Sequence, residues 1–439
     1  MPSLVTLASA RSLHSGRVAL FATLLVVLLF AGVSRRVFGS DHAVAARVSA
    51  AITLGGQLAY ISAGNVWVLQ SGGAPVQITN DGAATRVRWS PGGSLLLVDE
   101  RDQRLSLRPD GKPLPLGQGA WLPDDSALAT TAGGGDLQLL APDGSLLQTL
   151  VPSGARVLLQ PVAWSPDGAT LAFNRVVSDD RGIPTQQAVW LVGRAGGQAL
   201  ELLPPTDTWP EALGWSPDGR WLAVFRGPAM ACVSCRADGQ ELAAVELATG
   251  RTLPLGTVVR SDGYCFSADG KALIASAGAG RESYRDKRLL RLDLASGATS
   301  VLAGGGETAA IQPACAPRGE AVAYTLGPAL DGAPFSGLDA THGYPQSLLS
   351  GRRLRAGAAT AAAPPQGYAQ EAPHWAGTGA LLFVQWQVGA DAEPENASLW
   401  LEDTVGGEAT PVAATLGTST PPAPYFGDDG LADLFDWHP

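Results

Sequence analysis

The stretch Trp164-Ser-Pro-Asp-Gly168 occurs a second time, with identical residues, as Trp215-Ser-Pro-Asp-Gly219. Weaker copies keep part of this pattern, and they begin at Trp89, Trp121, Phe266, Cys315 and Trp375. Successive copies start 32, 43, 51, 51, 49 and 60 residues apart, which indicates an internal repeat. Pro and Asp favour the first positions of a tight turn, and Gly adopts a positive φ there at little cost. Each copy therefore predicts a strand that ends at its first residue and then turns sharply.

The residues after each copy form three further short apolar runs. After the copy at Trp164 they are 170–173, 188–191 and 199–202. Four short strands at a period of about 45 residues are typical of a β-propeller blade. The flat ring of the motif Trp suits a position between adjacent sheets. The residues with a structural role in the motif are Trp89, Trp121, Trp164, Asp167, Gly168, Trp215, Asp218, Gly219, Phe266, Asp269, Gly270 and Trp375.

A W-S-P-D-G sequence that opens a four-stranded unit resembles the TolB-like propeller repeats, which also occur in the propellers of prolyl-oligopeptidase-type peptidases. The resemblance covers residues 55–439, and it is weakest at Phe266, Cys315 and Trp375, where motif residues are replaced. It implies a propeller that acts as an interaction platform in envelope complexes. The separate N-terminal domain that precedes the propeller of TolB itself is not recognisable in this sequence.

The number of blades follows from how the ring closes. Residues 57–61, 65–69 and 76–79 look like the last three strands of a blade whose first strand is missing. The C-terminal stretch 431–439 ends in Trp-His-Pro, as a motif strand would, and we predict that it completes this first blade. Closure of this kind removes open sheet edges. The predicted fold is all-β: one propeller of eight four-stranded antiparallel blades, with seven blades as the alternative.

The region before the propeller contains a hydrophobic run. Residues 18–33 are sixteen consecutive uncharged residues, followed by Ser34, Arg35 and Arg36. The length is at the short limit for a membrane span, and the arginines occupy the place of a cleavage site. We predict a tail at 1–17, a transmembrane signal anchor at 18–34 and a linker at 35–54, with a cleaved signal peptide as the alternative. The flanking arginines favour a cytoplasmic C-terminus, whereas the family resemblance favours export.

Composition narrows the classes of partner and activity. The chain has 439 residues, 46% of them hydrophobic and 16% charged, and its net charge is −10. A large core is therefore expected, and nucleic acid is not expected as a partner because no basic run is present. The sequence contains no G-x-S-x-G nucleophile motif, no H-E-x-x-H motif and no Walker loop. No enzymatic activity and no cofactor are predicted.

The loops between the second and third strands of each blade, here called the B–C loops, differ around the ring. They are minimal in blades one to three and long in blades four to eight, at residues 176–187, 226–240, 276–287, 327–346 and 388–397. Long loops on one face of a scaffold tend to carry function. We predict that this arc is a binding surface; tolerated insertions without a role are the alternative.

Three carboxylates occupy the same place in their repeats, four residues before the motif: Glu211, Asp262 and Glu371. Near the mouth of the channel they would form a cluster that binds a cation or an amine, with Ca²⁺ as the metal that suits carboxylates. The alternative is three solvated carboxylates at loop ends.

The four cysteines and His374 are the remaining residues whose side chains could carry chemistry. Cys232 and Cys235 are predicted to form a local disulfide inside a long loop, because an exported protein meets an oxidising environment. Cys265 lies one residue before the first motif position of its blade, and Cys315 lies at that position in the next blade. With this offset of one residue, their side chains either face each other or face apart. We interpret both as buried thiols. His374 is interpreted as a packed or surface residue, with a place in the channel as the alternative.

The sequence therefore favours a membrane-anchored, non-enzymatic propeller that binds protein partners in the membrane or envelope, outside the cytoplasm. The alternative is an enzyme or a ligand- or glycan-binding protein that works at the mouth of the channel. A third, weaker hypothesis is a sensor that faces the cytoplasm.

Overall fold

The computed structural model describes residues 55–439 except 101–102, 115–116, 132–134, 229–238, 259–262, 279–286, 330–351, 357–358, 361–362, 389–393, 403–406, 414 and 419–429. The predicted anchor at 18–34, the linker at 35–54, Cys232, Cys235 and Asp262 lie outside the described residues. Among the described residues, no helix has the length and apolar character needed to cross a membrane.

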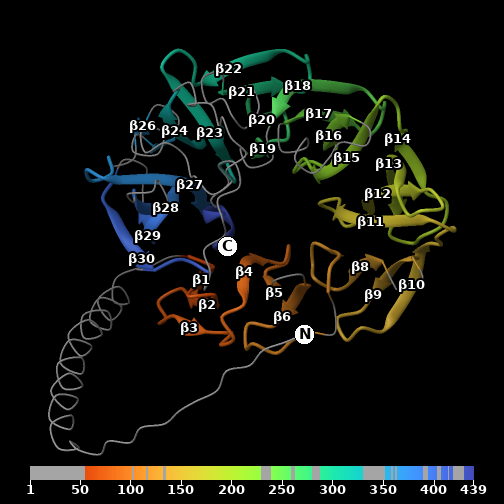
Figure 1. The fold of residues 1–439 in the computed structure, drawn as a ribbon, viewed down its shortest axis with the longest axis horizontal. Helices are drawn as coiled ribbons and strands as arrows, with labels where there is room; N and C mark the ends of the chain where they lie inside the picture. The colour runs from red at the N-terminus through yellow and green to blue at the C-terminus, as the bar shows by residue number, and fades with distance from the viewer. Residues whose placement is uncertain are drawn as a thin grey trace, which may run out of the picture. The chain divides into compact units, whose positions relative to one another are not determined.

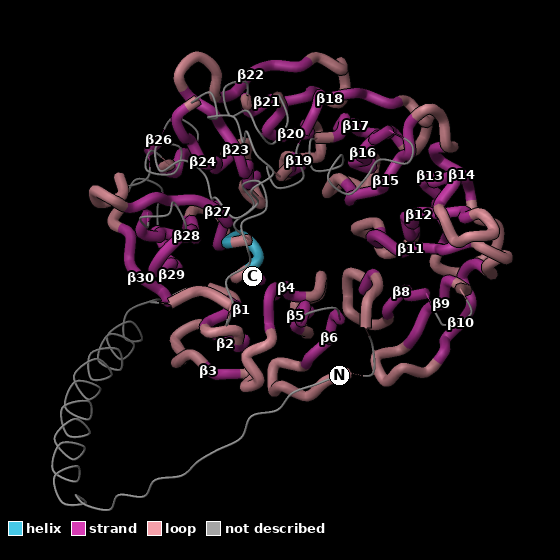
Figure 2. Tube along the Cα trace, viewed as in Figure 1, coloured by secondary structure: helices cyan, strands magenta, loops and turns pink. Residues whose placement is uncertain are grey.

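The described chain forms eight antiparallel sheets that follow one another around a ring (Figure 1). It is almost entirely strand and loop, with the short 3₁₀ helix η2 (Leu431–Asp433) before the last strand (Figure 2). Blade one contains β1 (Gln57–Ser62), β2 (Asn65–Gln70), β3 (Val76–Gln77) and β31 (Phe435–His438). The strands of blades two to four are β4 (Ala84–Trp89), β5 (Leu96–Glu100), β6 (Gln103–Leu107), β7 (Ala120–Trp121), β8 (Leu128–Thr131), β9 (Leu137–Leu140), β10 (Leu146–Val151), β11 (Val157–Trp164), β12 (Thr170–Ser178), β13 (Pro184–Gly193) and β14 (Leu200–Leu203). Those of blades five to eight are β15 (Thr208–Trp215), β16 (Trp221–Pro228), β17 (Gln240–Glu246), β18 (Thr252–Val258), β19 (Tyr264–Phe266), β20 (Ala272–Ala277), β21 (Arg288–Asp293), β22 (Thr299–Ala303), β23 (Thr308–Cys315), β24 (Val322–Pro328), β25 (Arg353–Ala356), β26 (Ala359–Thr360), β27 (Tyr368–Ala376), β28 (Ala380–Val388), β29 (Pro394–Glu402) and β30 (Ala409–Ala413).

The all-β propeller with eight blades is therefore confirmed, with one difference in detail. Seven sheets have four strands, and the sheet of blade two has three among the described residues. After β6 the chain pairs back only through an isolated bridge between Leu107 and Pro113.

The core lies between the blades, around their second and third strands. All six residues of β20 are buried, as are the first five of β16. Such strands are covered on both faces by neighbouring blades, which is why they are almost continuously apolar. The outermost strands are exposed instead, and β22 carries Val301 and Leu302 on the circumference of the ring.

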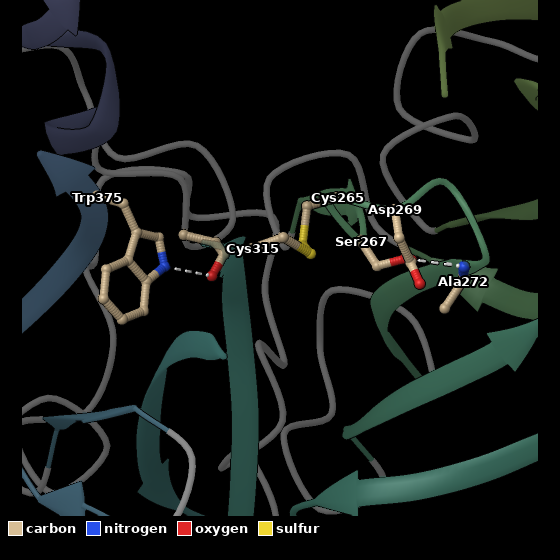
Figure 3. Close-up of a disulfide and its surroundings, with 7 residues drawn as sticks. Cys265, Ser267, Asp269, Ala272, Cys315 and Trp375 are labelled. Atoms are coloured by element: carbon tan, nitrogen blue, oxygen red, sulfur yellow. Dashed lines mark hydrogen bonds between the residues drawn. A yellow bond between two sulfur atoms is a disulfide. The ribbon is translucent and has the colours of Figure 1, made fainter. Parts of the chain in front are cut away.

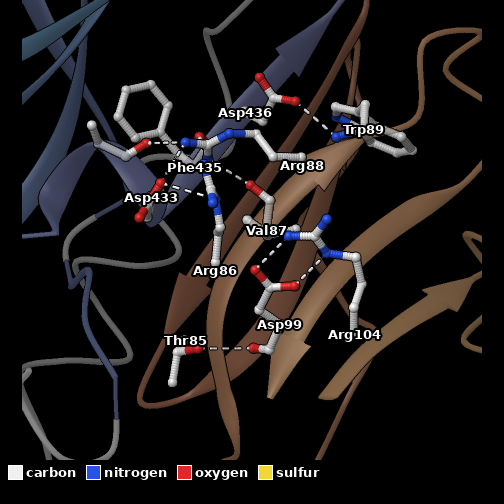
Figure 4. A network of polar contacts seen from close by, with 11 residues as sticks. Thr85, Arg86, Val87, Arg88, Trp89, Asp99, Arg104, Asp433, Phe435 and Asp436 are labelled. Carbon is white, nitrogen blue, oxygen red and sulfur yellow. Dashed lines mark hydrogen bonds and ion pairs between the residues drawn. The ribbon is translucent and has the colours of Figure 1, made fainter. Parts of the chain in front are cut away.

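The ring closes as the sequence predicted, because β31 pairs with β1 in an antiparallel register that sets Leu58 opposite Trp437. The closed blade is held to blade two by polar contacts (Figure 4). The guanidinium of Arg88 donates to Asp433 at 2.7 Å and to the carbonyl of Phe435 at 3.2 Å, and Arg86 lies 3.1 Å from Asp433. The closing strand therefore contacts both its own sheet and the next blade, and no open edge is left there.

The motif turns repeat one hydrogen-bond pattern. In blade four, the hydroxyl of Ser165 donates to Asp167 at 2.5 Å and accepts a hydrogen bond from the N–H of Thr170, while the N–H of Ala169 donates to Asp167. The same contacts recur in blades five and six, where Asp218 and Asp269 are the acceptors. The hydrogen bond from Ser267 is the largest of the effects that lower the pKa of Asp269, to about 2. The motif Asp is thus the residue that fastens the turn in blades four to six.

Candidate functional site

The second strands of the blades have unequal lengths, and the longest ones lie within the predicted arc, although β20 of blade six has six residues, as β1 of blade one has. β12 and β28 each have nine residues and β16 has eight, whereas β5 has five and β8 has four. The B–C hairpins of blades four, five and eight therefore extend farther than those of blades two and three. Most of the loop residues of blades five to seven lie outside the described residues.

Within the predicted arc, the B–C hairpin of blade four is the one whose tip is fully described. Its turn is fastened by Asp179, whose side chain accepts hydrogen bonds from the N–H groups of Arg181 and Ile183 at 2.8 and 2.9 Å. Asp180 forms an ion pair with Arg156 from the start of β11. The side chain of Ile183 is 42% exposed at this tip. An apolar side chain on a fastened, charged turn is a suitable anchor for a partner protein.

The structure corrects the expectation for Glu371. Instead of offering a free charge to the channel, Glu371 is 0% exposed and forms an ion pair with Arg352 at 2.5 Å. A buried carboxylate needs such a partner, because desolvation of an unpaired charge is costly. Glu211 lies on β15 and is half-buried, and Asp262 lies outside the described residues. In the described part of the chain, no group of three or more His, Cys, Asp or Glu residues could hold a metal ion. Cation binding at Glu211 and Asp262 stays a prediction.

His374 is part of the ring closure. Its Nε2 atom lies 3.9 Å from Asp436 on β31, and its ring meets that of Phe435 edge-on at 6.0 Å. Burial lowers the pKa of His374, an effect that Asp436 opposes and Arg88 reinforces. His374 is thus a packing residue between blade eight and the closing strand.

Three of the five motif tryptophans connect their blade to the one before it by a hydrogen bond, which the indoles of Trp89 and Trp121 do not make. The indole N–H of Trp164 donates to the carbonyl of Ala120 at 3.1 Å, that of Trp215 to Ala163 at 2.9 Å, and that of Trp375 to Ala314 at 2.9 Å. In each case the acceptor is the residue just before the first motif position of the preceding blade. We call this contact the indole link. It gives the motif Trp a polar function in addition to its apolar surface.

The structure also corrects the interpretation of Cys265 and Cys315 as buried thiols. The two form a disulfide, with their Cα atoms 5.7 Å apart, and both residues are half-buried (Figure 3). Cys315 occupies the first motif position of blade seven, where Trp375 stands in blade eight. Cys265 occupies the position before the motif in blade six, which corresponds to Ala314 in blade seven. The disulfide therefore joins the same two positions as the indole link. The offset of one residue between the cysteines is a sequence signal that indicates this pairing once the positions joined by the indole link are known.

Sequence reasoning missed the role of Asp125. The motif of blade two has Gly92 where Asp is usual, and the motif of blade three has Asp125 where Gly is usual. The buried carboxylate of Asp125 reaches across to blade two and accepts from the hydroxyl of Ser90 at 2.6 Å and from the N–H of Ser94 at 2.9 Å. These are the two contacts that a motif Asp makes within its own turn. Asp125 thus replaces, from the next blade, the carboxylate that blade two lacks.

No family model matches the sequence, and no curated protein matches it either. Among solved structures, the chain is similar to a putative TolB from Agrobacterium tumefaciens, with 13% identity and a TM-score of 0.35 over 87% of this chain and 98% of that one. It is similar to a prolyl endopeptidase with 14% identity and a TM-score of 0.47, over 91% of this chain and 55% of that one. It is also similar to the dihydro-heme d1 dehydrogenase NirN, with 15% identity and a TM-score of 0.47 over 87% of this chain and 77% of that one. Similarity at this level of identity assigns no activity to this chain.

Proposed function

We propose that the protein is a non-enzymatic propeller that binds a protein partner outside the cytoplasm through the B–C hairpins of blades four to eight. The observation that carries the proposal is the unequal length of these hairpins around an otherwise regular ring. β12 and β13 continue their pairing as far as Ser178 and Pro184, so the tip of blade four is held on a rigid two-stranded support.

The chemistry of the described tip favours a protein partner. Ile183 offers an exposed apolar side chain, and Asp179, Asp180 and Arg181 place charges of both signs beside it. Protein interfaces commonly join an apolar centre to a polar rim of this kind. The tip provides these groups on a convex hairpin, whereas small-molecule sites are usually concave.

The disulfide supports the proposed location. Structural disulfides persist in oxidising compartments and are rare in the cytosol. Cys265 and Cys315 join two blades that have no indole link between them, so the bond has a structural role there. A propeller that depends on such a bond is suited to the periplasm or the cell surface.

The proposal is tested by co-purification of partners with the tagged full-length chain and with a variant in which residues 179–184 are replaced by Asn-Gly, so that Thr185 supplies the N–H that closes the turn and Val177 stays opposite Gln186. Two residues of this type close a hairpin directly, so β12 and β13 keep their pairing while the tip is removed. We expect the partner recovered with the native chain to be lost or reduced at least tenfold. A narrower variant, Ile183→Ser, is expected to weaken the same partner severalfold.

The matched control is Val301→Ser, which removes an apolar side chain that is 55% exposed on the outer strand β22, away from the B–C hairpins. It is expected to leave recovery of the partner unchanged. Equal recovery with the native chain, the hairpin variant and both serine variants would contradict binding through this hairpin.

A further inference from the structure

A cleft of about 180 Å³ lies between blades six and seven. Its floor is apolar, formed by Ile274, Val322, Leu302 and the half-cystine Cys315. Ser267, Asp269, Gly319 and Glu320 from the two motif turns also line it, so the cleft lies on the face with the short turns, opposite the B–C hairpins.

The register of the strands shows what this position holds in the next blade interface. Ile274 is the partner of Cys265 across β19 and β20, as Ala323 is the partner of Ala314 across β23 and β24. Ser267 likewise corresponds to Ala316, the second residue of its motif. Ala316 and Ala323 belong to one apolar cluster with Trp375. The cleft therefore occupies the position that the Trp375 indole fills between blades seven and eight.

One further correspondence extends along the wall of the cleft. Arg291 pairs with Ile274, as Ala356 pairs with Ala323, and Ala356 is also in the cluster around Trp375. On this wall the guanidinium-bearing side chain of Arg291 thus stands where Ala356 has a methyl group in the next blade interface. The same chain stacks arginine on indole twice, with Arg251 5.3 Å from the ring centre of Trp221 and Arg175 5.6 Å from that of Trp190.

The cleft exists because Cys315 stands where the repeat usually has Trp. A disulfide fastens the two blades but occupies much less volume than an indole. An apolar cavity of about 150 Å³ is large enough for one benzene ring, so 180 Å³ accommodates a single aromatic side chain. At the mouth, Asp269 and Glu320 are exposed carboxylates, and Asp269 forms an ion pair with Lys271 at 3.2 Å. The half-buried guanidinium of Arg291 lies 3.6 Å from Asp293.

We propose that this cleft binds the indole side chain of a tryptophan in a partner peptide with basic flanking residues. The indole ring would lie on Ile274, Val322 and the sulfur of Cys315, beside the guanidinium of Arg291, as motif tryptophans lie elsewhere in the ring. Contacts of sulfur and of guanidinium with aromatic rings are both favourable. Three carboxylates (Asp269, Asp293 and Glu320) and two cations (Lys271 and Arg291) surround the mouth, so basic residues on either side of the tryptophan would face a net negative charge, chiefly that of Glu320. The cleft is independent of the B–C hairpins and does not require the function proposed for them.

The test is isothermal titration of the purified full-length chain with the peptide acetyl-Lys-Trp-Lys-amide, and with acetyl-Lys-Ala-Lys-amide as the matched peptide. We expect a dissociation constant below about 1 mM for the tryptophan peptide, in the range that one buried aromatic group gives. The alanine peptide is expected to bind at least tenfold more weakly. Equal binding of the two peptides, or no binding of the tryptophan peptide, would overturn the proposal. Saturable binding of free tryptamine without binding of the peptide would also overturn it, because it would identify a small-molecule site.

Two variants separate the cleft from the disulfide that borders it. Cys265→Ala with Cys315→Trp restores the indole of the repeat and fills the cleft, whereas Cys265→Ala with Cys315→Ala removes the disulfide and leaves the cleft open. Both lack the bond, so their folding is compared by circular dichroism before titration. We expect the alanine pair to bind the tryptophan peptide within about threefold of the native chain and the tryptophan variant to bind at least tenfold more weakly. Undiminished binding by the folded tryptophan variant would contradict the assignment.

Discussion

Removal of the Asp125 carboxylate tests whether neighbouring blades compensate for each other's departures from the motif. Asp125→Ala deprives four donors of their acceptor: the hydroxyls of Ser90 and Ser94 and the N–H groups of Gly92 and Ser94. The hydroxyl of Ser90 is buried, so the loss of its hydrogen bond to Asp125 costs roughly 1.5 kcal/mol. Ser94 and Gly92 are exposed and can bond to water, so their three contacts are worth about 0.5 kcal/mol each. The expected loss in free energy of unfolding is about 3 kcal/mol.

Placing the carboxylate on blade two instead of blade three tests the same contact from the other side. Gly92→Asp alone should also destabilise, because its Cβ would lie 2.7 Å from an oxygen of Asp125 and would add a second carboxylate there. Gly92→Asp with Asp125→Gly restores the usual motif in both blades. It also removes a left-handed backbone conformation from a non-glycine residue, since Asp125 has a φ of 55°. We expect the double variant to lie within about 1 kcal/mol of the native chain.

The assay is urea unfolding of the native chain, the three single variants Asp125→Ala, Asp125→Gly and Gly92→Asp, and the double variant, followed by tryptophan fluorescence and by circular dichroism. Coincident transitions justify a two-state treatment, and midpoints with a common slope give the free-energy differences. Asp125→Gly is expected to cost about 1 kcal/mol less than Asp125→Ala, because glycine relieves the backbone. Two results would refute the idea that Asp125 compensates for the Asp that blade two lacks. One is a loss of less than 0.5 kcal/mol in the free energy of unfolding on Asp125→Ala. The other is a double variant whose loss equals the sum of the losses of Asp125→Gly and Gly92→Asp.

Three further predictions concern the blade interfaces. Trp164→Phe removes the donor to the buried carbonyl of Ala120, and we expect a loss of about 1–2 kcal/mol in urea unfolding, whereas a change within 0.3 kcal/mol would contradict the indole link. Cys265→Ser with Cys315→Ser opens a loop of 50 residues and should cost about 2–4 kcal/mol relative to the oxidised chain; equal stability of the two would contradict the structural role of the bond. Because the pKa of His374 is lowered in the folded chain, the unfolded chain binds that proton more readily, and stability should fall as the pH drops below about 6.5. The pH dependence of unfolding between pH 7 and 5 should be shallower for His374→Phe than for the native chain, and identical slopes would contradict the lowered pKa of His374.

The repeat was readable from the sequence because its physical requirements are local. A turn that needs Pro, Asp and Gly at fixed places identifies each blade, and a set of three strands at 57–79 indicates that a fourth must come from elsewhere. The pairing of β31 with β1 follows from that deficit. The extent of each strand depends on its pairing within one sheet. The alternation of apolar residues along the chain already indicates where such strands lie.

The contacts between blades were harder to predict because they depend on register across two sheets. Spacing alone left Cys265 and Cys315 either facing or apart, and the offset of one residue became informative only when the indole link showed which positions meet. Glu371 was expected to be open to the channel, but its partner Arg352 precedes β25 in the neighbouring blade, 19 residues earlier in the chain, and no local pattern joins the two. Asp125 looked like a poor motif residue for the same reason, since its function lies in the preceding blade.

The most direct test of the central claim is a cross-linking map of the tagged full-length chain in intact membranes, with linked peptides identified by mass spectrometry. If the B–C arc is the binding surface, cross-links to one membrane or envelope protein should start from residues 176–187, 226–240, 276–287, 327–346 and 388–397, and not from the loops of blades one to three. Reproducible cross-links that start mainly from the loops of blades one to three, or the absence of any partner, would contradict the claim.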